Sequence, residues 1–188
     1  MGFEQSAKYY NDHLKKILKK EYRWYDLYEE ASRLLPPPDN RTIVDLGCGV
    51  GGFAELLFKK GYKNVLGIDF STYGVQVCQE RIPNFTFRVG DVRSSVTLKK
   101  LRGYSIFTIL EVLEHINGDM DLLYSIPSKS IVIFSVPNKD HGSHVRFFNN
   151  ANEVMERYKK VVRFECEKRV DKREKPGQIM FLFKTVRL

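Results

Sequence analysis

The chain has 188 residues, of which 43% are hydrophobic and 13% aromatic, and its formal net charge is +8. No apolar run approaches the roughly 20 residues of a membrane span, and no signal-peptide core is present, so we expect one soluble, cytoplasmic globular domain. The three cysteines lie far apart, which excludes a disulfide framework or a zinc knuckle. The positive charge permits nucleic acid as a partner, but acids interleave with it in the C-terminal tail and favour a solvated face.

Two helices are predicted ahead of the core. Apolar residues recur at helical spacing over residues 14–35. Three prolines at 36–38 end the second helix, because proline lacks the backbone donor and clashes with the preceding turn. We expect residues 1–38 to form a helical lid over a core of residues 39–188, within a single domain.

Aromatic side chains in this region are candidates for ligand contacts. An aromatic face attracts a cation and stacks on an aromatic substrate, which makes candidates of Tyr9, Tyr10, Trp24 and Tyr25. Packing within the helices is the simpler interpretation of Trp24. His13 stands in a lysine-rich helix, where we expect it to be solvated.

Strands and helices then alternate along the chain. Strands are predicted at residues 41–46, 64–69, 85–89, 104–110 and 130–136, and helices at 51–60, 71–81, 119–125 and 152–159. Two more strands, 161–167 and 178–187, are joined by a short segment with Pro176 and Gly177, which predicts an antiparallel hairpin. The pattern indicates an α/β fold, a Rossmann-like doubly wound and mostly parallel sheet that binds ligands at the carboxyl ends of its strands.

The segment IVDLGCGVGG, residues 43–52, predicts a buried strand, a glycine turn and the start of a helix. Without side chains in the way, a ligand can lie directly against such a turn. Gly47, Gly49 and Gly52 fit the G-x-G-x-x-G dinucleotide pattern, but Asp45 precedes them and repels a pyrophosphate. A carboxylate attracts an ammonium group instead, which favours S-adenosylmethionine, a nucleoside with an ammonium, a sulfonium and no phosphate.

Acids also end the next three strands. Asp69 stands 18 residues after Gly51, where it can accept hydrogen bonds from ribose hydroxyls. Asp91 follows the third strand, where an adenine amino group could donate to it, and Glu111 ends the fourth. Each acid alone could cap a helix or brace a turn. Together with Asp45, they favour a site for a cationic nucleoside.

These segments resemble the class I S-adenosylmethionine-dependent methyltransferases. The motifs of that family are matched by VDLGCGVG at residues 44–51, GIDFS at 67–71, GDV at 90–92 and, for the type 11/type 12 subgroup, TILEVLEH at 108–115. This subgroup includes quinone-biosynthesis methyltransferases. The resemblance implies a seven-stranded sheet with its last strand inserted antiparallel, and S-adenosylmethionine as cofactor with S-adenosylhomocysteine as product. The cofactor-binding residues that it implies are Asp45, Gly47, Cys48, Gly49, Gly51, Asp69, Phe70, Asp91, Val92, Leu110, Glu111 and Tyr10.

Methyl transfer from a sulfonium is an in-line displacement in which the protein mainly supplies position and desolvation. A general base is needed only where the acceptor holds its proton tightly. His144 is the first candidate base and His115 the second, because both follow strand ends and histidine has a suitable pKa. His141 lies near the same rim. A helix-start residue bonded to the backbone is the alternative interpretation of His115.

A metal site is the alternative use of the same residues. Two carboxylates and two imidazoles, from Glu111, Glu114, His115 and His144, can bind a divalent ion. This arrangement looks like that of the small-RNA 3′-end 2′-O-methyltransferases, although Glu-Val-Leu-Glu-His also occurs in relatives with no metal.

The sequence therefore predicts a methyltransferase that acts on an oxygen or nitrogen of a small-molecule acceptor. The acceptor pocket is expected between the N-terminal helices and residues 139–150. An RNA methyltransferase, including one for metal-assisted 2′-O-methylation, is the first alternative. A non-catalytic S-adenosylmethionine-binding regulatory partner is the second, and the intact row of acids argues against it. The oligomeric state is left open.

Overall fold

The computed structural model describes residues 2–17, 24–171 and 177–188. Its seven strands form one sheet in the order β3-β2-β1-β4-β5-β7-β6. The first five strands are parallel, whereas β7 runs antiparallel between β5 and β6. The strands are β1 (Ile43–Leu46), β2 (Val65–Asp69), β3 (Thr86–Val89), β4 (Ile106–Ile109), β5 (Ile131–Pro137), β6 (Val162–Asp171) and β7 (Ile179–Arg187).

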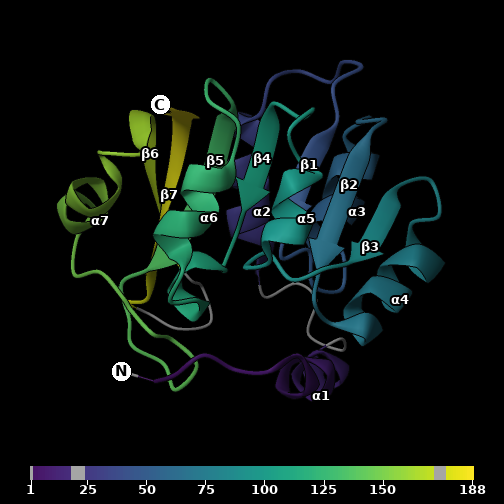
Figure 1. The fold of residues 1–188 in the computed structure, drawn as a ribbon, viewed down its shortest axis with the longest axis horizontal. Helices are drawn as coiled ribbons and strands as arrows, with labels where there is room; N and C mark the ends of the chain where they lie inside the picture. Colours follow the sequence, from purple (N-terminus) through teal and green to yellow (C-terminus); the bar gives the residue numbers. More distant parts are fainter. Residues whose placement is uncertain (1, 18–23, 172–176) are drawn as a thin grey trace.

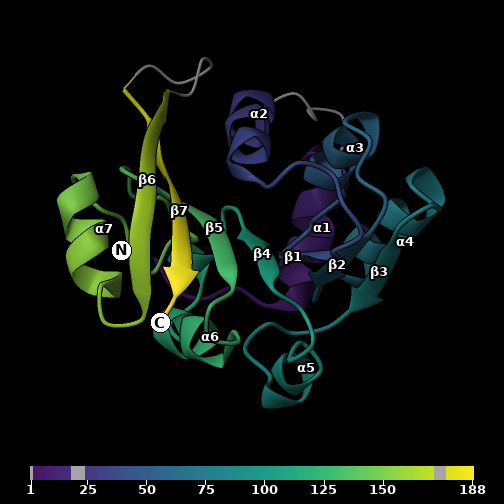
Figure 2. The same ribbon diagram turned by 90° about the horizontal axis from the view of Figure 1, so that it is seen from above.

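Helices cover both faces of the sheet, and one helix lies across the ends of its strands (Figures 1 and 2). The helices are α1 (Ala7–Ile17), α2 (Tyr25–Leu34), α3 (Gly52–Lys59), α4 (Thr72–Arg81), α5 (Ser95–Lys99), α6 (Asp119–Ser125), α7 (Ala151–Tyr158) and the 3₁₀ helix η2 (Leu113–His115). Helices α2, α3 and α4 lie on one face, and α5, α6 and α7 on the other. Helix α1 lies across the ends of the parallel strands, at the bottom of Figure 1.

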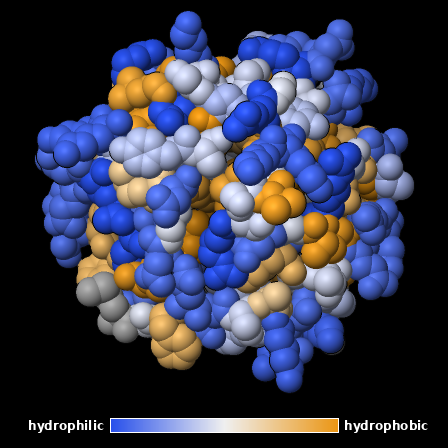
Figure 3. All heavy atoms as spheres, viewed as in Figure 1, coloured by the Kyte–Doolittle hydropathy of each residue, from blue (hydrophilic) through white to orange (hydrophobic). Residues whose placement is uncertain are grey.

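Each face of the sheet has its own hydrophobic core. Leu27, Phe53 and Val75 bring α2, α3 and α4 against one face. Leu98 and Tyr158 belong to the cluster on the opposite face. Every residue of β1, β2 and β4 is buried, as expected for strands that are covered on both sides. The surface seen in Figure 3 is largely hydrophilic, with apolar side chains in small separate groups.

The predicted fold class is confirmed, including the antiparallel hairpin at the end of the chain. Most predicted elements start and end within two residues of the observed ones. Strand β6 runs on to Asp171, past the predicted end at residue 167, because Glu167 to Asp171 keep pairing with β7. Helix α5 was not predicted, since five residues with a single buried apolar side chain, Leu98, show no helical period.

The N-terminal prediction holds where the structure describes it. Helix α2 ends at Leu34, just before the prolines, while residues 18–23 lie outside the described part. No helix among the described residues is long and apolar enough to cross a membrane. The cytoplasmic location and the division of one domain into a lid and a core stay predictions.

Candidate functional site

The glycine loop between β1 and α3 needs glycine for its backbone and for space. Gly47 has φ +81° and Gly51 has φ +85°, in the left-handed region that other residues rarely adopt. A Cβ on Gly47 would lie 2.3 Å from Cγ2 of Val112. The backbone N–H groups of Gly47 and Cys48 donate to the carbonyl of Ile68 on β2, at 2.7 and 3.2 Å. These bonds hold the loop against the strand ends.

Asp69, the last residue of β2, ties this loop to helix α4. Its Oδ2 accepts from the N–H of Gly49 at 2.9 Å, and its Oδ1 accepts from the N–H of Ser71 at 2.8 Å. Ser71 in turn caps α4, since its hydroxyl accepts from the N–H of Gly74. Burial raises the pKa of the Asp69 carboxyl, while the two N–H donors oppose that change. Each oxygen can still accept a further hydrogen bond from a ligand.

Asp45 lies behind the glycine loop instead of facing a ligand directly. Its carboxyl is buried and accepts from the Thr108 hydroxyl at 2.7 Å. Burial raises the pKa of Asp45 to about 7, against the lowering effect of that hydrogen bond. Asp45 does not line the cavity described next, so any attraction for a ligand acts through the loop.

A cavity of about 220 Å³ opens at the carboxyl ends of the parallel strands. Ten of the predicted cofactor-binding residues line it: Gly47, Cys48, Gly49, Asp69, Phe70, Asp91, Val92, Leu110, Glu111 and Tyr10. Asp45 and Gly51 were also predicted but do not line it. Side chains that the sequence did not assign to the cofactor also contribute, among them Gln5, His13, Tyr28, Arg93 and Ile116.

Helix α1 supplies the aromatic roof of the cavity. The Tyr10 ring packs 5.2 Å from Phe70 and 5.9 Å from His115, centroid to centroid. The Tyr10 hydroxyl is buried and has no hydrogen-bond partner within the described ranges. Burial, reinforced by nearby Glu114, raises its pKa, so the phenol stays protonated. Asn11, the next residue, fixes α1 by accepting from the Ser71 hydroxyl at 2.6 Å.

The other aromatic candidates lie in different places. Tyr9 and Tyr25 are exposed and do not line the cavity, and the Tyr25 hydroxyl donates to Glu29. Trp24 packs against the core, which confirms the packing interpretation; it also lines the cavity, and its contact with a ligand stays a prediction. His13, which was expected to be solvated, is half-buried: its side chain lines the cavity, and its ring stacks on that of Tyr9 at 5.8 Å.

Arg93 is a site residue that the sequence did not indicate. Its guanidinium donates to both carboxyl oxygens of Asp91, lies 3.2 Å from Glu4, and sits over the Phe70 ring. The pair keeps the pKa of Asp91 below its usual range. Any bond between Asp91 and adenine must therefore coexist with this ion pair. The D-x-R spacing at residues 91–93 was the one sequence signal that could have indicated a contact between Arg93 and Asp91.

Glu111 and Glu114 form a second acidic group beside the cavity. Glu111 has φ +60°, an unusual conformation for a residue with a side chain, and its N–H donates to the Ser135 hydroxyl at 3.0 Å. Such strain concentrates at functional sites. Glu114, on η2, is fully buried, and burial together with the Glu111 carboxyl raises its pKa well above the usual range.

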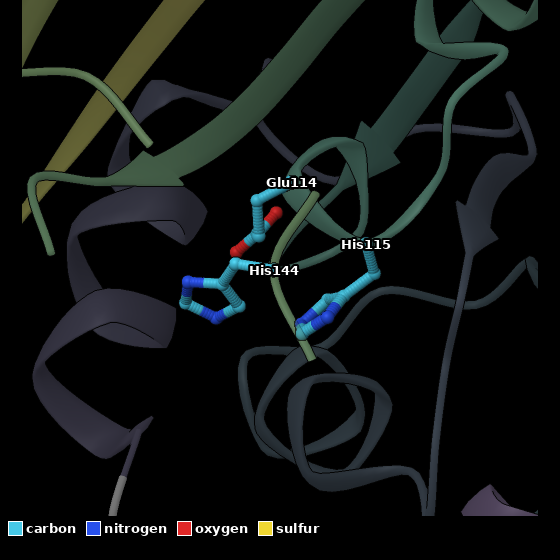
Figure 4. A group of neighbouring side chains, drawn as sticks. All are labelled: Glu114, His115 and His144. Carbon is cyan, nitrogen blue, oxygen red and sulfur yellow. The ribbon is translucent and has the colours of Figure 1, made fainter. Parts of the chain in front are cut away.

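Two histidines, His115 and His144, lie next to Glu114 (Figure 4). The rings of His115 and His144 lie 4.8 Å apart, and exposed His141 follows at 5.3 Å from His144. His115 lines the cavity, whereas buried His144 does not. Burial lowers the pKa of His115 to about 4, so this ring is neutral at neutral pH. The base roles proposed for both residues stay predictions.

Comparisons with known proteins agree with this geometry. Residues 43–125, from β1 to the end of α6, match the methyltransferase domain family. The fold matches magnesium protoporphyrin IX methyltransferase of Synechocystis, solved with bound SAH, at a TM-score of 0.71 and 15% identity over 96% of this chain and 97% of that one. Residues 43–125 therefore carry a methyltransferase domain, in agreement with the resemblance of the motifs to class I S-adenosylmethionine-dependent methyltransferases. The predicted cofactor, S-adenosylmethionine, agrees with this domain match.

Two relatives by sequence are also methyltransferases. A ubiquinone biosynthesis O-methyltransferase of Paracidovorax citrulli is 28% identical over 121 residues, which cover 55% of this chain and 50% of the relative. An uncharacterised RNA methyltransferase of Clostridium acetobutylicum is 36% identical over 76 residues, covering 38% of this chain and 16% of the relative. The chain thus spans half the length of the first relative, and the names of the two relatives point to different acceptors.

Proposed function

We propose that the chain transfers the methyl group of S-adenosylmethionine to an oxygen or nitrogen of a small-molecule acceptor. The observation that carries the proposal is the cavity at the strand ends, with the glycine loop and Asp69 on one side and the Tyr10 ring above. The ubiquinone-pathway relative, an O-methyltransferase, supports a small acceptor.

The cavity fits an S-adenosylmethionine ligand in its chemistry. The open backbone at Gly47 and Gly49 offers room for the methionine part, and the Asp69 carboxyl has lone pairs left for ribose hydroxyls. Val92 offers an apolar surface for the adenine ring, and Asp91 with Arg93 offers polar groups for its edge. The buried Tyr10 hydroxyl, with no partner in the described residues, is satisfied if a ligand or its water bonds to it.

When bound, the cofactor supplies the activated methyl group. The residues of the chain position the reactants and exclude water. Tyr10 and Phe70 cover the cavity with rings whose faces favour a sulfonium. Asn11 and Leu14 seat α1 on the glycine loop and on α4, which closes this side of the site to solvent. Desolvation and alignment of this kind are the main contributions that a protein makes to methyl transfer.

An RNA acceptor is the second candidate, favoured by the Clostridium relative and by the net charge of +8. Among the described residues that line the cavity, Arg93 is the one Lys or Arg, and it is already paired with Asp91 and Glu4. A groove for a phosphate backbone needs more cations than that. Fluorescence anisotropy with a labelled single-stranded RNA distinguishes the two: the small-molecule proposal expects weak binding, whereas tight binding that weakens steeply with salt supports RNA.

Replacement of Asp69 tests the cofactor site. In Asp69→Ala, the ribose loses its acceptor and the glycine loop loses its anchor, so we expect the affinity for S-adenosylhomocysteine to fall by about 30-fold or more, the equivalent of about 2 kcal/mol. The matched control is Asp121→Ala, at an exposed acid on α6 outside the cavity. Calorimetry that gives equal affinities for the two variants would contradict the proposed position of the ribose.

A further inference from the structure

We propose that Glu114, His115 and His144 bind a divalent transition-metal ion. Each residue offers one ligand atom, and these atoms all lie within 4.8 Å of one another. In Figure 4, the Glu114 carboxyl extends from η2 above the two imidazoles, of which His115 comes from the same short helix and His144 from the loop after β5. One carboxylate and two imidazoles are a common protein ligand set for such ions.

The two imidazoles are oriented as in metal sites. The Nδ1 of His115 lies 2.9 Å from the carbonyl oxygen of Ser143, and the Nδ1 of His144 lies 3.1 Å from that of Lys139. A carbonyl can only accept, so both Nδ1 atoms carry hydrogen and donate. The basic nitrogen of each neutral ring is then Nε2. A backbone carbonyl on the other ring nitrogen is the usual support of a metal-bound histidine.

The Glu114 carboxyl lacks donors that would satisfy its charge. Both oxygens are buried and have no hydrogen-bond partner of normal geometry within the described residues, and the carboxyl of Glu111 lies beside them. The guanidinium of Arg146 directs its hydrogens elsewhere, to the carbonyls of Leu113, Ile116 and Asn117 and to Asp119. A carboxylate and two imidazoles thus converge, and their ligand atoms lie close enough together for one cation to bind all three.

The backbone holds the two segments together independently of any ion. The N–H of Val145 donates to the carbonyl of Glu114 at 2.8 Å, and the N–H of His144 donates to that of His141 at 2.8 Å. The ligand atoms therefore converge without folding around a metal. Such a prearranged set of three leaves coordination positions open, which is typical of catalytic rather than structural sites.

This assignment changes two expectations from the sequence. Glu111, expected as a fourth ligand, is not one of the grouped residues. His115 and His144 become ligands in place of general bases. Because His115 lines the cavity, open positions on the ion can face an acceptor, which favours an acceptor with an oxygen ligand such as a hydroxyl. This last consequence, unlike the binding of the ion, rests on the proposed function.

Metal titration without any methyl donor tests the site. The purified chain is stripped with EDTA and titrated with Mn²⁺, followed by electron paramagnetic resonance, and with Zn²⁺, followed by calorimetry. We expect one ion per chain for at least one of these metals. Glu114→Gln and His144→Gln should each weaken binding at least tenfold. The matched control His141→Gln changes an exposed histidine of the same loop and should leave the affinity unchanged.

A thermal melt of Glu114→Gln shows whether this variant is folded. Without metal, the neutral Gln amide replaces a buried carboxyl of about the same size, so the melting temperature should equal or exceed that of the wild type. The proposal is overturned if neither metal binds stoichiometrically at 1 mM, or if folded Glu114→Gln binds as tightly as the wild type. Because S-adenosylhomocysteine is absent from this titration and is measured separately, failure of the metal site and failure of the proposed function are distinguishable.

Discussion

The buried Asp45 carboxyl makes the stability of this protein depend on pH. Its pKa is about 7 in the folded chain, because burial disfavours the charged form, and about 3.9 in an unfolded chain. The folded state therefore holds this proton more tightly than the unfolded state. Its contribution to stability is complete below about pH 4 and is lost as the pH rises to 7. The difference corresponds to about 4 kcal/mol as an upper limit.

Asp45→Asn removes this dependence. The amide oxygen of asparagine can still accept from the Thr108 hydroxyl, and no charge is buried at high pH. We expect the variant to gain stability over the wild type by about 2 to 3 kcal/mol more at pH 8 than at pH 5. Urea unfolding followed by circular dichroism at the two pH values measures this gain, with Asp121→Asn, an exposed acid, as control. A stability difference between Asp45→Asn and wild type that is the same at both pH values would refute the reasoning.

Two further substitutions test contacts that stabilise the fold. Gly47→Ala places a Cβ 2.3 Å from Cγ2 of Val112 at a residue with positive φ, so we expect the free energy of unfolding, measured with urea, to fall by about 2 to 4 kcal/mol. Gly61→Ala, also at positive φ but with nothing within 4 Å, should lose only about 1 kcal/mol, and equal losses would contradict the clash. Asp119→Asn removes the charge of a buried carboxylate that accepts from half-exposed Arg157, and should cost about 1 to 3 kcal/mol; a thermal melt unchanged from wild type would show that the pair contributes nothing.

The fold could be predicted because its signals are local. Buried strands such as β4 are continuous apolar runs, and the glycine loop and the proline stretch mark boundaries by their backbone chemistry. Two features had no such signal. Helix α5 buries one apolar residue and is too short to show a period. The full length of β6 depends on pairing with β7, which is a contact between segments and not a property of either.

The site divides in the same way. Residues on the loops that directly follow β1, β2 and β4 could be identified from position alone, because parallel strands end at the same edge. Whether each side chain faces the cavity or is buried behind the loop could not be predicted. Asp45 is in the expected place along the chain, yet its alternation within β1 turns the carboxyl toward Thr108, behind the loop. Which residues of α1 line the cavity, His13 among them, depends on how that helix packs on the core. The sequence alone does not show how the helix packs.

Side-chain partners were the least predictable part. Arg93 donates hydrogen bonds to Asp91, two residues earlier in the sequence, and to Glu4, which precedes it by 89 residues. The grouping of His144 with Glu114 and His115 needs the loop after β5 to fold back on η2, through the bond between Val145 and Glu114. The motif suggested which residues to consider, and the three-dimensional arrangement selected three of the four.

Binding of S-adenosylhomocysteine to the wild-type chain tests the central claim most directly. Isothermal titration calorimetry at pH 7.5 should give saturable binding to one site per chain with a dissociation constant on the order of micromolar, about −8 kcal/mol. Adenosine alone should bind more weakly, because it lacks the amino-acid part that contacts the glycine loop. No saturable heat at millimolar S-adenosylhomocysteine with folded protein would contradict the assignment of this cavity as the cofactor site.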